Sequence, residues 1–246
     1  MSIKFIILGC GSSLGVPRID GFFGNCDPKN KKNYRTRCCA LIKSKNKNVL
    51  IDTSPDLKQQ LIKNKINNID KVFYTHHHAD QTHGINELRF FYIKNRKKID
   101  IYTNNLTKKY LLNSFGYCFK KNREYPPILQ NNSLKKKHSY KDNGKIISLK
   151  SIKVEHGNID SICYVINNKL AYASDVSKIY KKDLKSLNNL KYLVIDCLQY
   201  NFHPSHYCLT DILLLIKIIK PKKTILTNLA SSIAVSYTHL RAHETS

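Results

Sequence analysis

The most constraining feature of this sequence is a short apolar run, Val72-Phe73-Tyr74, that leads directly into the polar motif Thr75-His76-His77-His78-Ala79-Asp80-Gln81. The β-branched and aromatic side chains of the run predict a buried strand, so the histidines stand where this strand leaves its sheet. His76 and His78 are two residues apart, and in extended backbone both imidazoles project to the same side and can bind one cation. A carboxylate beside two imidazoles, here Asp80, is typical of a centre that binds a metal ion and the water it activates.

Three further polar residues stand at the ends of predicted strands elsewhere in the chain: His156, Asp175 and Asp196. Each of them alone is more often a capped loop residue or a satisfied interior polar group. Together with the histidine motif they indicate an active site, because such sites gather at one edge of a sheet from loops that are distant in sequence.

The rest of the chain alternates between strands and helices. The spacing of apolar residues predicts helices over 56–66, 86–94, 106–115, 179–187 and 209–219. Apolar and β-branched runs predict strands over 3–8, 39–42, 49–52, 72–74, 99–102, 146–154, 161–166, 170–174, 192–196 and 224–227. We expect the lysine-rich segment from Leu134 to Lys145 to be a loop, because it shows no period. Strands with interspersed helices, repeated in two halves, predict an α/β (α+β) protein with two mixed β-sheets packed together and helices outside.

The formal net charge of +25 over 246 residues would normally suggest a nucleic-acid-binding protein. Lysine, however, outnumbers arginine about five to one, and arginine is the residue that reads bases and binds phosphates in bidentate fashion. We therefore expect weak, salt-sensitive attraction to polyanions and no specific nucleic-acid partner. Arg35 and Arg37 stand at the end of a long loop and either contact a substrate phosphate or are simply solvated.

Length and cysteine usage favour an intracellular protein with one large core. The eight cysteines are scattered in a chain without a secretory signal, which favours free thiols over a disulfide framework. There is no run of about twenty apolar residues, so we expect a cytoplasmic protein without a membrane partner. The sequence leaves the oligomeric state open, with a homodimer as one option.

These motifs resemble those of metallo-β-lactamase-fold hydrolases and, within that superfamily, the phosphoribosyl 1,2-cyclic phosphate phosphodiesterase branch. The matching segments are Leu8-Gly9-Cys10-Gly11-Ser12-Ser13, Leu50-Ile51-Asp52-Thr53, Thr75 to Arg89, Tyr172-Ala173-Ser174-Asp175 and His203-Pro204-Ser205-His206. The resemblance covers residues 3 to 229 and implies an αββα sandwich with a metal centre at its edge. It implies that His76, His78 and His156 hold one cation, that Asp80 belongs to a second site and that Asp175 bridges the two.

The same resemblance implies hydrolysis of a small, cyclic phosphodiester, in which a metal-bound hydroxide attacks phosphorus. Zn²⁺ or Mn²⁺ is the expected cofactor, with one or two ions per chain. His206 is the candidate general acid for the leaving alkoxide, because an imidazole titrates near neutral pH; the alternative is a cap on the helix that begins near Leu209. Asp80 is assigned a catalytic as well as a metal-binding role, and Ser205, Arg35 and Arg37 are expected to contact the substrate.

The sequence departs from the family pattern at the second metal site. Gln81 and Asn228 occupy positions where the family has histidine ligands. Since an amide offers a carbonyl oxygen, we expect both to be ligands of an oxygen-rich second site that takes a hard ion such as Mn²⁺ or stays largely empty. The alternative is that His83 moves in as a ligand while the amides only line the pocket. The family's cysteine-rich structural zinc motif is also absent, with only Cys26 in that loop.

The end of the chain differs in composition from the rest. The family pattern stops after Leu229, and from Ala234 onward there is no lysine, asparagine or isoleucine. We expect residues 1–229 to form the hydrolase domain and residues 230–246 to be a non-native, adapter-derived tail in place of the natural C-terminal segment. From Val235 the tail is predicted to be disordered or to pack without a core face, and its His239 and His243 are excluded as ligands.

Two other functions remain open at this stage. A nuclease of the same superfamily that acts on RNA 3′ ends fits the basic charge, but no Gly/Pro-rich insertion supplies the arm with which such nucleases grip RNA. A non-catalytic nucleic-acid-binding protein needs aromatic residues interleaved with arginines on one face, whereas the fifteen tyrosines here are dispersed.

Overall fold

The computed structural model describes residues 3–123, 125–234 and 239–241, the last three by their backbone alone. The chain forms two compact units, each with its own sheet and its own core. Unit 1 consists of residues 1–9, 37–135 and 142–145, and unit 2 of residues 10–36, 136–141 and 146–246.

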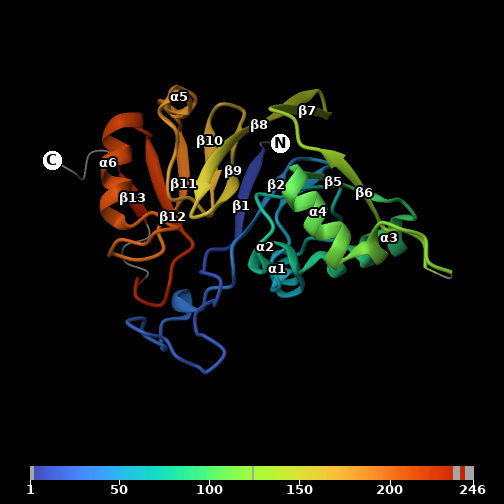
Figure 1. Ribbon diagram of the computed structural model, residues 1–246, viewed down its shortest axis with the longest axis horizontal. Coiled ribbons are helices and arrows are strands. Elements are labelled where there is room, and N and C mark those ends of the chain that lie inside the picture. Colours follow the sequence, from blue (N-terminus) through green and yellow to red (C-terminus); the bar gives the residue numbers. More distant parts are fainter. Residues whose placement is uncertain (1–2, 124, 235–238, 242–246) are drawn as a thin grey trace. The chain divides into compact units, whose positions relative to one another are not determined.

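Unit 1 is built on a six-stranded mixed sheet whose strands lie in chain order (Figure 1). They are β1 (Lys4–Gly9), β2 (Cys39–Lys43), β3 (Asn48–Ile51), β4 (Lys71–Phe73), β5 (Ile99–Thr103) and β6 (Leu129–Ser133). The first three pair antiparallel, and β3 to β6 pair parallel. The helices are α1 (Leu57–Lys63), α2 (Ala79–Thr82), α3 (Leu88–Asn95) and α4 (Asn105–Ser114), with 3-10 turns at Ile85–Glu87 and Gly116–Cys118. Because β3, β4 and β5 are parallel, their carboxyl ends meet at one edge of this sheet.

The core of unit 1 explains why these segments are strands. Leu41, Leu50, Val72 and Ile101 come from four neighbouring strands, and each is completely buried. Full burial of one such side chain contributes about 1.5–3 kcal/mol relative to leaving it exposed. The core therefore fixes the register of β4 and, with it, the point at which the histidine motif leaves the sheet.

Unit 2 is built on a seven-stranded mixed sheet in the order β13-β12-β11-β10-β9-β8-β7 (Figure 1). Its strands are β7 (Lys137–Asp142), β8 (Lys145–His156), β9 (Ile159–Ile166), β10 (Leu170–Ala173), β11 (Tyr192–Asp196), β12 (Lys223–Thr227) and β13 (His239–Arg241). The strands β10, β11 and β12 are parallel. The helices are α5 (Lys181–Leu184) and α6 (Leu209–Ile219), with 3-10 turns at Lys31–Asn33 and Lys185–Leu187.

Helix α6 confirms the segment predicted over 209–219. Ile212, Leu215, Ile216 and Ile219 repeat at three and four residues and are buried in the core of unit 2. The helix is capped by Cys208, whose backbone N–H donates to Asp211 at 3.0 Å. The cap is therefore neither His206 nor Ser205.

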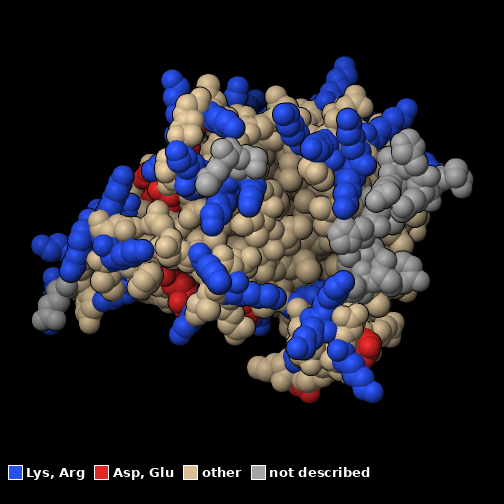
Figure 2. Space-filling view, turned by 180° about the vertical axis from the view of Figure 1, so that it is seen from behind, with Lys and Arg blue, Asp and Glu red and all other residues tan. Residues whose placement is uncertain are grey.

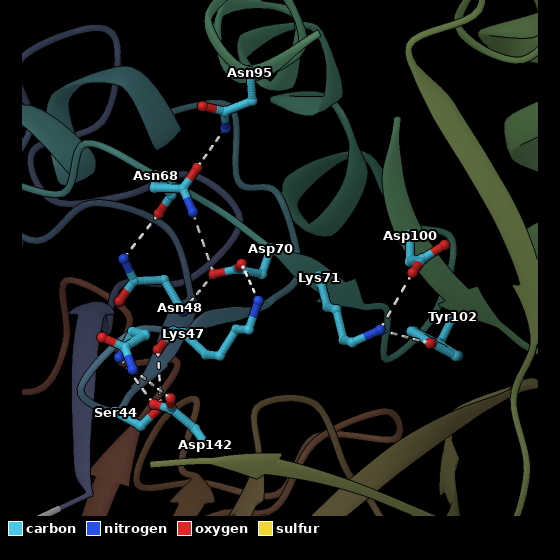
Figure 3. A network of polar contacts seen from close by, with 11 residues as sticks. Ser44, Lys47, Asn48, Asn68, Asp70, Lys71, Asn95, Asp100, Tyr102 and Asp142 are labelled. Carbon is cyan, nitrogen blue, oxygen red and sulfur yellow. Dashed lines mark hydrogen bonds and ion pairs between the residues drawn. The ribbon is translucent and has the colours of Figure 1, made fainter. Parts of the chain in front are cut away.

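A polar network lies at the amino ends of the parallel strands of unit 1 (Figure 3). Lys47 Nζ lies 3.1 Å from Asp70 Oδ1, and Lys71 Nζ bridges Asp100 at 3.2 Å and the Tyr102 hydroxyl at 3.1 Å. Such partly exposed pairs contribute at most about 1 kcal/mol each. They help to hold strand ends together at this edge, whereas the histidine motif leaves β4 at the other.

Besides β13, two strands of the structure were not expected. The segment 134–145, predicted to be a loop, contains β7, and β6 was not predicted at all. Both are edge strands, so one long side of each needs no partner and lysine or asparagine is tolerated along it. Lys137, Ser139 and Lys141 of β7 are exposed and alternate with less exposed residues. The loop prediction was wrong because an edge strand lacks the apolar run of a central strand.

The end of the chain also differs from expectation. Ile233 is buried in the core of unit 2, and the backbone carbonyl of Ser231 accepts a hydrogen bond from Asn25. The folded part of unit 2 therefore extends at least to Ile233 and not only to Leu229. Within the tail that was predicted to be disordered or to pack without a core face, His239–Arg241 form β13 and pair antiparallel with β12; residues 235–238 and 242–246 lie outside the described residues. Among the described residues, none of the helices has the length and apolarity needed to cross a lipid bilayer.

Candidate metal centre

In unit 1, the first histidine of the motif is oriented by a buried relay of hydrogen bonds. Asp52 follows β3 in the left-handed region, with φ of 64°, and accepts from the Thr75 backbone N–H at 2.7 Å and from Thr75 Oγ1 at 2.9 Å. The hydroxyl has only one proton to donate, so it must accept from His76 Nδ1, 3.0 Å away. This arrangement places the His76 proton on Nδ1 and leaves the lone pair of Nε2 for a ligand.

His78 and Asp80 follow on the same segment. The rings of His76 and His78 lie 4.6 Å apart between centroids, as expected for imidazoles on one side of an extended backbone. His78 is exposed and precedes α2, whose first turn contains Asp80. The neighbouring His77 has its pKa lowered by partial burial and by the nearby His78.

Gln81 is completely buried beneath Asp80. Its side-chain Nε2 donates to Asp80 Oδ2 at 3.2 Å, and its backbone carbonyl accepts from Thr53 N–H at 2.8 Å. The amide therefore presents its nitrogen to the carboxylate. The expectation that Gln81 offers its oxygen to a cation stays a prediction, since only the position of the nitrogen is fixed by this contact.

Gly84 and His83 complete the segment. A Cβ at Gly84 would overlap the backbone carbonyl of Ser54, so only glycine allows α2 to pack this closely on the loop after β3. His83 Nε2 lies 2.9 Å from the Tyr110 hydroxyl, and its ring stacks parallel to that of Tyr110. These contacts occupy His83, so the structure does not support it as a replacement ligand.

In unit 2, His156 is oriented in the same way as His76. Its Nδ1 lies 2.6 Å from the backbone carbonyl of Ser205, and since a carbonyl can only accept, Nδ1 carries the proton. Gly157 follows with φ of 59°, and a Cβ there would overlap the Ser205 side chain. Ser205, expected to contact substrate, thus acts on His156 through its backbone.

His206 forms a pair with a buried carboxylate at the carboxyl end of β11. Its Nδ1 lies 2.6 Å from Asp196 Oδ2, with the Asp196 side chain fully buried and 14% of the His206 side chain exposed. His156, Asp175 and His206 each place one donor atom within 4.8 Å of the others, with spacing that could hold a metal ion. Asp196 also accepts from the Val176 N–H at 2.9 Å, which ties the loop after β10 to this pair.

Asn228, in the left-handed region with φ of 60°, follows β12 and lies between these carboxylates. Its Nδ2 lies 3.2 Å from Asp175 Oδ1 and 3.1 Å from Asp196 Oδ1. Two acceptor oxygens account for both N–H groups, so the 3.1 Å approach to His206 Nδ1 is a contact between two donors and not a further hydrogen bond. In this orientation the nitrogen of Asn228, and not its oxygen, faces the carboxylates, so ligation of a cation through Oδ1 stays a prediction.

The two arginines expected to bind substrate are used in packing. Arg35 is 4% exposed; it donates to the backbone carbonyls of Leu229, Ala230 and Ile233 and to Asn33 Oδ1. A guanidinium with these partners cannot turn to a phosphate without breaking the loop that it holds, so the substrate role of Arg35 stays a prediction that these contacts do not favour. Arg37 is more exposed, but its Nη1 pairs with Asp56 Oδ1 at 2.8 Å.

Two residues of this arrangement were not assigned a role from the sequence: Asp52 and Thr75. Asp52 stands directly after the apolar run Val49-Leu50-Ile51, so the strand-end rule that indicated Asp175 and Asp196 would have found it. Thr75 carried no comparable signal, since a threonine beside a histidine motif is unremarkable until its hydroxyl is seen between Asp52 and His76.

A sequence model of the β-lactamase superfamily domain matches residues 47–227. The chain belongs to the β-lactamase superfamily. Its structure superposes on a diphosphatase of the PhnP family with a TM-score of 0.82 and 26% identity, over 95% of this chain and 88% of that one. Zn²⁺-bound PqqB from Methylobacterium extorquens gives a TM-score of 0.71 at 13% identity, over 93% and 89% of the two chains. The expected fold class, an αββα metallo-β-lactamase sandwich with two mixed sheets and flanking helices, is confirmed.

A curated relative carries a different name. The octanoyltransferase of Porphyromonas gingivalis (strain ATCC BAA-308 / W83) is 27% identical over 242 residues, which are 97% of this chain and 48% of that protein. The chain thus spans about half the length of this relative, whose name describes a longer protein.

Proposed function

We propose that the protein is a metal-dependent phosphodiesterase that hydrolyses a small, cyclic phosphodiester. The observation that carries the proposal is the Asp196–His206 pair beside His156 and Asp175. A buried carboxylate on Nδ1 stabilises the protonated imidazole and fixes its ring, which leaves the Nε2 proton for transfer to a leaving oxygen. The likeness to a PhnP-family diphosphatase supports a phosphorus centre as the site of attack.

We further propose that His76, His78 and Asp80 of unit 1 and His156 and Asp175 of unit 2 are ligands of a divalent cation. The donors fit such an ion, because Thr75 and the Ser205 carbonyl keep the Nδ1 atoms of His76 and His156 protonated and their Nε2 lone pairs available. Nitrogen and carboxylate donors suit Zn²⁺ best and accept Mn²⁺. A divalent cation in such a centre polarises the phosphoryl group and activates water.

The bond changes balance within this scheme. The oxygen of water forms a bond to phosphorus, and the bond from phosphorus to one ring oxygen breaks. His206 gives its proton to that leaving oxygen, so the alkoxide departs as a hydroxyl and the product is a phosphomonoester. The attacking water loses one proton to solvent, and His206 takes one back from solvent before the next turnover. Asp196 keeps its charge throughout and orients His206.

An RNA 3′-end nuclease is the main competing function. Figure 2 shows lysine and arginine side chains spread over the face that it draws, and not gathered into one band that could follow a polynucleotide. On this face there is therefore no basic band to support a polynucleotide substrate. The name of the P. gingivalis relative suggests one further class of substrate to test, an octanoyl donor.

Turnover by the purified protein with Zn²⁺ or Mn²⁺ tests these functions together. The substrates are a five-membered ribose cyclic phosphate, a bis(aryl) phosphodiester, a precursor tRNA and an octanoyl thioester. We expect the cyclic phosphate to give the highest kcat/KM and the bis(aryl) diester to be cleaved more slowly. Cleavage of the tRNA alone would establish the nuclease, and octanoyl release alone would replace the phosphodiesterase proposal.

A further inference from the structure

The strongest unassigned feature of the site is the use of two buried side-chain amides to hold two carboxylates. Asn228 contacts Asp175 in unit 2, and Gln81 contacts Asp80 in unit 1. In each pair the amide nitrogen faces the carboxylate. Each pair lies within one unit, so the two observations are independent of each other.

The orientation of Asn228 is determined by its neighbours. Asn228 is 1% exposed, and its Nδ2 lies between Asp175 Oδ1 and Asp196 Oδ1. Turning the amide over would place an oxygen at 3.1–3.2 Å from two carboxylate oxygens. Two charge-assisted hydrogen bonds would then become two repulsive contacts. Asn228 Oδ1, which is buried without a hydrogen-bond partner among the described residues, stays turned away from both carboxylates.

Gln81 has the same relation to Asp80. Its Nε2 donates to Asp80 Oδ2 at 3.2 Å, while the Thr53 N–H holds its backbone carbonyl at 2.8 Å. The contact with Thr53 fixes the backbone of Gln81, and the hydrogen bond to Asp80 fixes its side-chain amide. A carboxylate held by a donor on one oxygen keeps its other oxygen for a cation, which is how amides support metal ligands without binding the metal.

We propose that Gln81 and Asn228 are anchors of the carboxylates Asp80 and Asp175 and not metal ligands, so that the protein binds a single tightly held cation. This inference rests on the ligands of the proposed function. Without the amides, and with His206 held by Asp196 as the proposed general acid, a second ion is left with the two carboxylates alone, one protein ligand short of the three that a catalytic zinc site uses. Asn228 is also a positioning residue, because its amide nitrogen contacts both Asp175 and Asp196, and Asp196 in turn binds His206.

The test measures metal binding and not turnover. Zn²⁺ is removed with a chelator and restored by equilibrium dialysis; bound zinc is counted by elemental analysis, and the dissociation constant is obtained by competition with a chromophoric chelator. The variants are Asn228→Ala, the double variant Gln81→His/Asn228→His and, as a matched control at another buried asparagine, Asn33→Ala. Histidine tolerates the left-handed backbone of position 228 better than most residues, so the double variant preserves the local conformation. Circular dichroism of each metal-free variant checks folding.

One tightly bound zinc per wild-type chain and two per chain of the double variant are expected. In Asn228→Ala the single zinc should bind about 10–100-fold more weakly, because Asp175 loses its donor, whereas Asn33→Ala should bind it as the wild type does. Two tight ions in the wild type, one of which is lost in Asn228→Ala while the other keeps its affinity, would show that the amide is a ligand and overturn the inference. Absence of any tight zinc from the folded wild type would overturn the proposed function itself.

Discussion

Replacing Asp52 by asparagine should weaken metal binding by changing the tautomer of His76. Asp52 accepts two hydrogen bonds, from the Thr75 N–H at 2.7 Å and from Thr75 Oγ1 at 2.9 Å. In Asp52→Asn, the amide oxygen can keep the first, but the Nδ2 group must donate to the Thr75 hydroxyl. The hydroxyl then points its own proton at His76 Nδ1, which becomes an acceptor. The His76 proton moves to Nε2, the atom that the proposed cation needs.

The magnitude follows from two separate effects. Asparagine is nearly isosteric with aspartate and tolerates the φ of 64° at position 52, so no backbone strain is added. Two charge-assisted hydrogen bonds become neutral ones, which lowers the free energy of unfolding by about 1–2 kcal/mol. Loss of an orienting partner behind a histidine ligand costs about 10–100-fold in metal affinity, or about 1.4–2.7 kcal/mol.

Zinc affinity by chelator competition, together with the ring ¹⁵N shifts of His76 in the metal-free protein, measures both effects. Thr75→Ser keeps the hydroxyl and should bind zinc as the wild type does. Asp100→Asn changes a partly exposed aspartate of the same sheet, paired with Lys71, and controls for the loss of one negative charge. Unchanged zinc affinity in Asp52→Asn, with the His76 proton still on Nδ1, would refute the relay.

Three further outcomes are expected. His206→Ala should lower turnover roughly 10²–10⁴-fold, as loss of a general acid does, with bound zinc unchanged; loss of zinc would make His206 a ligand. Gly157→Ala should lower the free energy of unfolding by at least about 1 kcal/mol, measured in urea, because its φ is positive and Ser205 occupies the space; equal stability would contradict this packing. Burial raises the pKa of Cys118 to about 11, so only about a thousandth of it is thiolate at pH 8. A disulfide reagent should therefore modify half-buried Cys10 before Cys118, and the rate at Cys118 should rise with pH; equal rates would contradict its burial.

The sequence predicted best those parts of the fold that rest on local pattern. Helix α6 begins and ends as its apolar spacing indicated, and β4 precedes the histidine motif as the run Val72-Phe73-Tyr74 required. The edge strands β6 and β7 were missed, since their pairing comes from neighbouring strands and not from their own side chains. The residues proposed as ligands were identified by type and position, but their roles in metal binding remain proposals.

The sequence by itself determined which chemistry is available: imidazoles and carboxylates at strand ends, in a chain of the β-lactamase superfamily. Only the tertiary structure decided the direction in which each polar group points. An asparagine offers a donor and an acceptor on the same side chain, and nothing local selects between them. At position 228 the choice is made by Asp175 and Asp196, which arrive from other strands with acceptor oxygens. The same holds for Arg35, whose guanidinium could meet a phosphate or a backbone carbonyl, and which the carbonyls of residues 229, 230 and 233 bind instead.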